Sequence, residues 1–140
     1  MSEQQPISCD LRVRYADCDA QGIIFNGRWF ELFDTAMTEF WREVIGGYDH
    51  LPRGLGVETV VAETGARFRG AGRFDDLLTF KMRVARIGES SLRMEIDALR
   101  DGTLIAEGFI EYVFVDSSSL QPVGIPEQVR GMLPEPAASS

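Results

Sequence analysis

The sequence predicts an α+β fold in which one long helix packs on an antiparallel sheet. Three observations point to this class: a segment of alternating apolar and polar residues, a long apolar helical pattern after it, and four strand-like segments after the helix. The length of 140 residues fits a single domain, with its core at about residues 7–116. We expect frayed ends over residues 1–6 and from about residue 132 onward.

The first strand is expected between Ile7 and Tyr15, where apolar residues alternate with polar ones. Turn-forming residues then break the alternation from Ala16 to Gly22. The residues expected to face the core are Ile7, Cys9, Leu11, Val13 and Tyr15.

The helix is expected to begin at Asn26, a good N-cap, and to end at the Gly46-Gly47 pair. Such a helix of about 19 residues is roughly 28 Å long at 1.5 Å per residue. Its apolar stripe is broad, so we expect the helix to be largely enclosed. The residues of the stripe are Trp29, Phe30, Leu32, Phe33, Ala36, Met37, Phe40, Trp41 and Val44.

Four strands are expected after the helix. Val57–Arg69 is either one long strand or two short ones interrupted by Gly65, and Leu78–Ile87 and Leu92–Ala98 follow it. Asp101-Gly102 is a strong hairpin signal before the last strand, Leu104–Val115. Because that strand is apolar on both faces except at Glu107 and Glu111, we expect both faces to be covered.

The charge balance restricts the partners of this protein. Fourteen basic and 22 acidic residues give a formal net charge of −8, which argues against nucleic acid or an anionic membrane as the main partner. The N-terminal residues lack the basic and apolar regions of a signal peptide, and no apolar run approaches the roughly 20 residues that a membrane helix needs. We therefore expect a cytoplasmic protein without a membrane partner.

Histidine and cysteine are scarce, with His50, Cys9 and Cys18 as the only examples. Their number and irregular spacing predict no metal site and no disulfide framework. We interpret both cysteines as small buried residues and His50 as a surface residue of the loop after the helix.

The residues that carry chemistry lie between the first strand and the helix: Asp17-Cys18-Asp19, then Gly22, then Asn26. A carboxylate just before a helix N-terminus lies near unpaired backbone amides, where the helix dipole favours negative charge. It can serve as nucleophile or general base on an acyl carbon while the amides stabilise an oxyanion, without histidine. From spacing alone, the alternative that Asp17 and Asp19 only cap turns and Gly22 only permits one stays open.

This stretch resembles the motif of the 4-hydroxybenzoyl-CoA thioesterase-like family of hotdog-fold acyl-CoA thioesterases. The element order agrees over about residues 7–116. The resemblance implies a hotdog fold, with one long central helix wrapped by a five-stranded antiparallel sheet, and hydrolysis of an acyl-CoA or acyl-carrier-protein thioester. It implies no cofactor, because coenzyme A is part of the substrate. The matching residues are Tyr15, Asp17, Asp19, Gly22, Ile23, Ile24, Phe25 and Asn26, followed by Trp29, Phe33 and Thr38-Glu39-Phe40.

The resemblance also implies roles for residues of this chain. Asp19 is the expected catalytic carboxylate, the backbone amide of Asn26 is expected to polarise the thioester carbonyl, and Asp17 is expected to order the loop. The expected oxyanion and substrate-binding residues are Gly22, Phe25, Asn26, Gly27, Trp29, Arg67 and Phe68.

One feature departs from the family pattern. A relative with an aromatic acyl-CoA preference holds the CoA nucleotide with a basic cluster after the third strand, whereas the turn Ile87–Ser91 of this chain has no basic residue. A solvated surface role is the alternative for each of the remaining CoA phosphate candidates, which are Arg67, Arg69, Arg73, Arg86 and Arg93.

Two other functions stay open at this point. One is a thioesterase that serves a polyketide or fatty-acid pathway on a carrier protein. The other is a non-catalytic hotdog or cone-shaped module that binds an apolar ligand. Asp19 argues against the module, because a pure binding pocket has no need of an uncompensated carboxylate at a helix N-terminus.

Assembly is expected as well, because one helix on a five-stranded sheet leaves sheet edges unpaired. The resemblance implies a homodimer or homotetramer with active sites at the subunit junction. We expect Val57–Arg69 of one chain to face Asp19 of its neighbour, with Arg67 and Phe68 reaching across after the Gly65 break.

Overall fold

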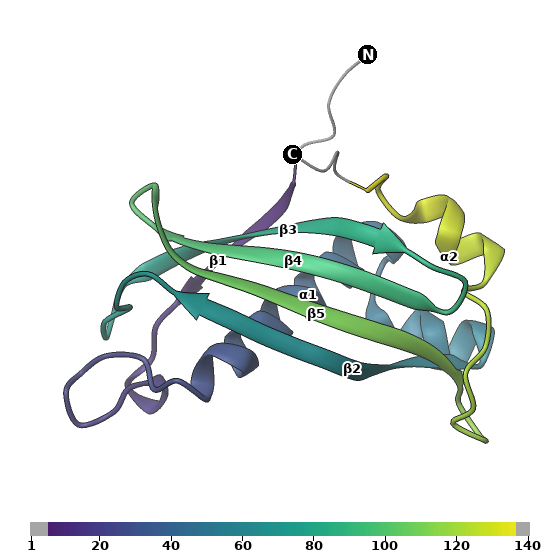
Figure 1. Ribbon diagram of the computed structural model, residues 1–140, viewed down its shortest axis with the longest axis horizontal. Coiled ribbons are helices and arrows are strands. Elements are labelled where there is room, and N and C mark those ends of the chain that lie inside the picture. The colour runs from purple at the N-terminus through teal and green to yellow at the C-terminus, as the bar shows by residue number, and fades with distance from the viewer. Residues whose placement is uncertain (1–5, 137–140) are drawn as a thin grey trace, which may run out of the picture.

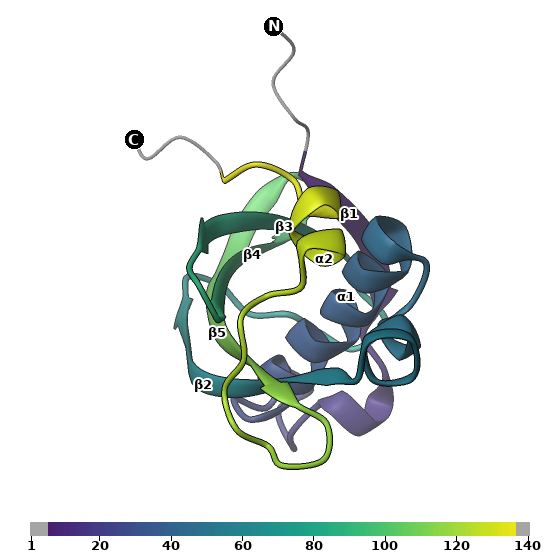
Figure 2. The same ribbon diagram turned by 90° about the vertical axis from the view of Figure 1, so that its right-hand side faces the viewer.

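The computed structural model of the protein describes residues 6–136, and its five strands form one antiparallel sheet. The strand order is β1-β3-β4-β5-β2, and the sheet curves around α1 (Figures 1 and 2). The predicted α+β class is therefore confirmed. The elements are β1 (Ile7–Arg12), α1 (Arg28–Ile45), β2 (Val57–Phe68), β3 (Leu77–Ile87), β4 (Ser91–Arg100), β5 (Thr103–Asp116) and α2 (Glu127–Met132), with short helical segments at Tyr15–Asp17, Tyr48–His50 and Leu51–Leu55.

Strand β1 is shorter than the alternation predicts. It ends at Arg12, and Tyr15 begins a turn of 3-10 helix and is 82% exposed, so its expected place on the core face is wrong. The backbone amide of Asp17 donates to the Arg14 carbonyl at 3.0 Å, which closes this turn. The turn redirects the chain toward α1 and so starts the loop that carries the candidate carboxylates.

Helix α1 begins one residue later than predicted, with Gly27 and not Asn26 as its N-cap. It ends at Gly46 in the left-handed conformation, as predicted. One side of the helix is buried against the sheet, but the helix is not largely enclosed: Glu31, Asp34 and Thr35 are exposed, and Phe30 is 37% exposed. This open side faces the neighbourhood of β2.

Strand β2 is continuous, and Gly65 does not interrupt it. The irregularity lies between Val61 and Glu63, where the register against β5 shifts. Gly65 is instead a place of close approach, because a Cβ there would lie 2.7 Å from the ring of Phe109 on β5. The aromatic ring thus covers the position where a side chain is missing.

The β4–β5 hairpin turns at Asp101 and Gly102, which both have positive φ, as the hairpin signal predicts. The inner face of β5 is buried, whereas Glu107, Phe109 and Glu111 on its outer face are only partly covered within one chain. The expectation that both faces are covered is therefore met only in part.

The C-terminal segment is more ordered than expected. Helix α2 lies over one end of the curved sheet beside α1 (Figure 2), and Ile125, Val129 and Leu133 are buried in the core. The Arg130 side chain donates to the carbonyls of Gly88 and Glu89 and so fixes α2 to the β3–β4 turn. The expectation of fraying from about residue 132 is wrong for Leu133; residues 1–5 and 137–140, also expected to fray, lie outside the described residues.

Candidate functional site

The loop between β1 and α1 is fixed by a buried ion pair. The Asp17 side chain is 2% exposed, and its carboxylate accepts hydrogen bonds from the Arg14 amide at 2.8 Å and from the Arg14 guanidinium at 2.9 and 3.3 Å. Burial by itself would raise the pKa of Asp17, but the hydrogen bonds from Arg14 outweigh it and the pKa is lowered. The Asp17 carbonyl also accepts from the Phe25 amide at 3.0 Å. Asp17 therefore orders the loop, as interpreted from the sequence.

Asp19 lies on the same loop in a different environment. It is partly exposed, and its Oδ1 atom accepts hydrogen bonds from the backbone amides of Gln21 at 2.8 Å and Ile23 at 3.4 Å. Its Oδ2 atom accepts no hydrogen bond from any residue between 6 and 136. One oxygen thus holds the side chain in a defined direction while the other stays available to a ligand.

Two backbone amides near the start of α1 are also available. The amides of Arg28 and Trp29 already donate to Phe25 and Asn26, whereas those of Asn26 and Gly27 have no acceptor within the described part of the chain. Phe25, Asn26 and Gly27 are exposed, so the two amides are not shielded by a tight core. Free amides at the positive end of an 18-residue helix suit a developing oxyanion.

A second loop supports the one that carries Asp19. The connection between β2 and β3 bridges it at Ile23 and Arg73, and the Ile24 amide donates to the Gly72 carbonyl at 2.8 Å. A Cβ on Gly72 would lie 2.4 Å from the Ile24 side chain, so any larger residue there would force the buried Ile24 side chain to shift. Gly22 has a φ of +79°, which is the left-handed turn that the motif requires.

The aromatic residues of the motif region divide between core and surface. Trp29 is 3% exposed and packs against Phe33, Phe68 and Phe80 with ring centroids 5.8, 6.0 and 6.4 Å away. Phe68 is 43% exposed, so it links this cluster to the surface. Trp29 therefore belongs to the buried aromatic cluster behind the first turn of α1.

A groove of about 410 Å³ runs between the exposed side of α1 and strand β2. It begins at Phe30 in the first turn of α1, directly after the free amides of Asn26 and Gly27. Its lining residues are Phe30, Glu31, Asp34, Thr35, Val61, Thr64 and Ile110. No sequence motif singled out this groove, because its two walls are 26 or more residues apart along the chain.

The five arginine candidates for a CoA phosphate do not form one cluster. Arg69 is paired with Glu107, and Arg86 donates to Glu111 at 2.6 Å. The guanidinium of Arg93 lies 4.1 Å from the centre of the Phe109 ring. The side chains of Arg67 and Arg73 have no partner among the residues that the structure describes.

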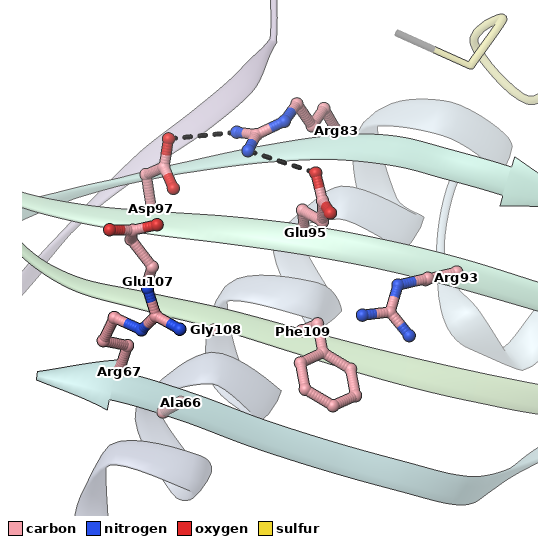
Figure 3. A pocket seen from close by; sticks show the side chains of 9 residues that line it. All are labelled: Ala66, Arg67, Arg83, Arg93, Glu95, Asp97, Glu107, Gly108 and Phe109. Atoms are coloured by element: carbon pink, nitrogen blue, oxygen red, sulfur yellow. Dashed lines mark hydrogen bonds and ion pairs between the residues drawn. The ribbon is translucent and has the colours of Figure 1, made fainter. Parts of the chain in front are cut away.

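Arg67 and Arg93 lie on the outer face of the sheet, which Figure 3 shows from close by. A shallow hollow of about 370 Å³ there is lined by both arginines, and Arg83 in the same hollow is held by Glu95 and Asp97 at 3.2 and 3.0 Å. Arg73, by contrast, belongs to the loop that supports Asp19. Its proximity to the candidate carboxylate therefore favours Arg73, rather than the outer-face arginines, as a contact for a CoA phosphate.

The thiols and His50 have no place in this chemistry. Burial raises the pKa of Cys9 to about 11, and burial with the carboxylates of Asp17 and Asp19 raises that of Cys18, so both thiols are protonated near neutral pH. Both cysteines are free and only partly buried, so their interpretation as small buried residues holds only in part. His50 is exposed after α1, as interpreted.

Residues 6–136 offer neither a metal site nor a membrane-spanning helix. No group of three or more His, Cys, Asp or Glu side chains is arranged to hold a metal ion. No helix in that range combines the length and apolar character needed to span a bilayer.

Sequence reasoning missed Arg14, Gly72 and the groove. Arg14 lies on the polar side of the predicted strand, where an arginine is common. Nothing in the sequence pattern therefore indicated its ion pair with Asp17. Gly70 and Gly72 did offer a signal in the sequence, since closely spaced glycines indicate a close approach of the backbone to another segment.

Comparisons with known proteins agree with this geometry. The family model described as the thioesterase-like superfamily matches residues 13–133. An acyl-CoA thioesterase, YbgC of Haemophilus influenzae, is 25% identical over 123 residues, which cover 88% of this chain and 90% of that protein. The crystal structure of the PA5185 protein from Pseudomonas aeruginosa is 28% identical, covers 93% of this chain and 90% of that one, and has a TM-score of 0.82. A probable thioesterase from Bartonella henselae shares the fold at 24% identity, with a TM-score of 0.81 over 86% of this chain and 99% of that one.

Proposed function

Because this chain belongs to the thioesterase-like superfamily, we propose that the loop of Asp19 and the first turn of α1 form the active site of an acyl-CoA thioesterase. The observation that carries the assignment is the free Oδ2 atom of Asp19 on the same loop as the free amides of Asn26 and Gly27. A carboxylate and oxyanion donors are the two parts that thioester hydrolysis needs.

In the reaction, the thioester carbonyl oxygen accepts hydrogen bonds from the Asn26 and Gly27 amides, which stabilise the charge it gains. As general base, Asp19 removes a proton from water while the water oxygen bonds to the acyl carbon. The carbon–sulfur bond then breaks, and the thiol leaves with the proton that Asp19 held. As nucleophile, Asp19 would bond to the acyl carbon while the carbon–sulfur bond breaks and the thiolate leaves. Water would then cleave the resulting anhydride, which frees the acyl group as its acid and restores the Asp19 carboxylate, and a proton of that water goes to the thiolate.

The acyl group extends from these amides into the groove between α1 and β2. Its apolar wall of Phe30, Val61 and Ile110 suits an aliphatic or aromatic acyl group. We assign the sheet that curves around α1 to the hotdog arrangement, with α1 as its central helix. Cytoplasmic location and the absence of a cofactor stay predictions of the sequence.

A second copy of the chain completes the site in this proposal. Strand β2 is an edge strand, and Val60 and Val61 on it are 41% and 54% exposed. Pairing of β2 with its copy would cover these valines and close the groove. It would also bring Arg67 and Phe68 toward the Asp19 loop of the neighbour, in a homodimer or a homotetramer.

CoA phosphates are expected to contact Arg73 first. Its guanidinium is free and its backbone bridges the Asp19 loop, whereas Arg69 and Arg86 already have carboxylate partners. Arg67 of the neighbouring chain is the second contact in this scheme.

The test is a hydrolysis screen in which each acyl group is offered on CoA and on the phosphopantetheine of a carrier protein. Acetyl, hexanoyl, lauroyl and benzoyl groups cover length and aromaticity, and the released thiol is measured. We expect turnover of CoA thioesters that is lost in Asp19→Asn. Faster turnover on the carrier protein would favour the carrier-protein function, and tight binding without turnover would favour the non-catalytic module.

A further inference from the structure

The groove between α1 and β2 has one polar feature that the proposed reaction does not use. Its far part is lined by Asp34 on α1, and the Asp34 carboxylate has no hydrogen-bond or ion-pair partner within residues 6–136. The other acidic residue of the groove, Glu31, is neutralised by Arg28 at 2.7 Å. The groove therefore carries one uncompensated negative charge.

Tyr112 on β5 lies near Asp34. The residue is only 4% exposed, and among the described residues its hydroxyl has no hydrogen-bond partner. Among the described residues, Ser117 alone has a fully buried side-chain oxygen that lacks a hydrogen-bond partner. The Tyr112 hydroxyl, which also lacks a partner, is therefore not fully buried and keeps some contact with solvent. Burial, together with the nearby Asp34 carboxylate, raises the pKa of Tyr112, so the phenol stays neutral and adds no second negative charge to the region.

The spacing fits an acyl tail. Helix α1 begins at Arg28, and Asp34 lies six residues further along it, which is about 9 Å at 1.5 Å per residue. A thioester carbonyl held at the Asn26 amide can thus send its acyl tail past Phe30 to the level of Asp34.

We propose that Asp34 is a specificity-determining residue that makes the groove reject acyl groups ending in a carboxylate and accept neutral ones of the same length. The proposal rests on the proposed thioesterase function. The physical basis is repulsion between two negative charges in a groove whose opposite wall is apolar and where water screens them less than in bulk solvent.

The test compares decanoyl-CoA with sebacoyl-CoA, which have ten-carbon acyl groups long enough to reach the level of Asp34 and differ by a terminal carboxylate. The ratio of kcat/KM for the two substrates is measured for the wild type, for Asp34→Asn and for Glu43→Gln. Glu43 is exposed on the same helix and does not line the groove, so its variant makes the same change of charge elsewhere on α1. We expect Asp34→Asn to raise the sebacoyl-to-decanoyl ratio by about five- to tenfold, while Glu43→Gln leaves it within error.

An unchanged ratio in Asp34→Asn would overturn the proposal, and so would an equal rise in both variants, which would reveal only the overall charge of the protein. Non-hydrolysable thioether analogues of the two substrates supply a second readout, the ratio of their Kd values. If no thioester is hydrolysed but the Kd ratio changes as expected in Asp34→Asn alone, the proposed function fails and the charge selectivity of the groove stands.

Discussion

At the scale of single residues, Asp17 and Asp19 are two positions apart and have opposite surroundings. Asp17 is buried and surrounded by donors of Arg14, whereas Asp19 keeps one oxygen free. The two carboxylates thus separate into one that holds the loop and one that is available for chemistry. Substitutions of Asp17 and Asp19 are therefore expected to differ in their effects on activity and stability.

Replacing Asp19 with Asn should lower kcat by about 100-fold or more, because general-base or nucleophilic participation contributes on that scale. The Oδ1 atom of Asn can still accept from Gln21 and Ile23, so the melting temperature should stay near that of the wild type. Steady-state kinetics on the best substrate, with thermal unfolding as the control, make the measurement. Wild-type turnover in this variant would remove Asp19 from the mechanism.

Replacing Asp17 with Asn should reduce kcat less than the Asp19 change but lower the free energy of unfolding by about 1–3 kcal/mol, because the buried side chain at position 17 loses its charge-assisted hydrogen bonds from Arg14. The pKa of Asp17 is lowered in the folded state, so its stabilisation is present above the unfolded pKa and is lost as pH falls below about 4. The difference in stability between wild type and variant should therefore shrink from pH 7 to pH 3 in urea titrations. If Asp17→Asn impaired kcat more than Asp19→Asn, the catalytic register would be shifted by two residues.

At the scale of elements, the helix and the sheet approach closely because glycines replace side chains at the contacts. Gly108 on β5 lies under α1, where a Cβ would be 2.6 Å from the Phe33 ring, and Gly65 on β2 lies under the Phe109 ring. Neither position is a turn. Gly108 sets the distance between α1 and β5, whereas Gly65 leaves room for the Phe109 ring of the neighbouring strand.

Gly108→Ala should destabilise the protein by about 1–3 kcal/mol, because Phe33 is fully buried and cannot move aside without displacing its neighbours. Gly131→Ala is the matched control, since nothing lies within 4 Å of its added methyl group and it sits in helix α2. That change should be neutral or stabilise by up to about 1 kcal/mol. Chemical denaturation measures the free energy of unfolding of both variants. Equal stability of the two would show that α1 tolerates a wider separation from β5.

At the scale of the whole molecule, the sheet has two free edges with different surfaces. The β1 edge is short, at six residues, whereas the 12-residue β2 edge carries the exposed valines at 60 and 61 beside the groove. A long edge with exposed valines is suited to pairing with another copy.

Val60→Lys should shift the protein toward monomer and reduce kcat/KM by at least about tenfold, since a buried lysine on a paired edge disfavours pairing. Val60 does not line the groove, so loss of activity would report on assembly. Ser8→Lys, an exposed position on the β1 edge, is the control and should keep both assembly and activity. Light scattering at assay concentration measures the first property. A fully active monomer would mean that one chain holds a complete site.

The sequence by itself determined the fold class, the order of the elements and the region of the site. These features depend on local patterns: the period of apolar residues, the Asp101-Gly102 turn, and a carboxylate pair ahead of a helix N-terminus. The limits of β1 and the N-cap of α1 were off by one to three residues, because the loop hydrogen bonds of Asp17 end the strand and draw the chain into a turn.

Only the tertiary structure decided which arginines are already paired. It also decided the role of Gly65 and the existence of the groove that Asp34 lines. Each of these depends on residues far apart in the chain, such as Arg69 with Glu107 or Gly72 with Ile24. The physical reason is that a local pattern records which side of an element is apolar, whereas ion pairs, close approaches and cavities depend on which side chains the folded sheet brings opposite one another.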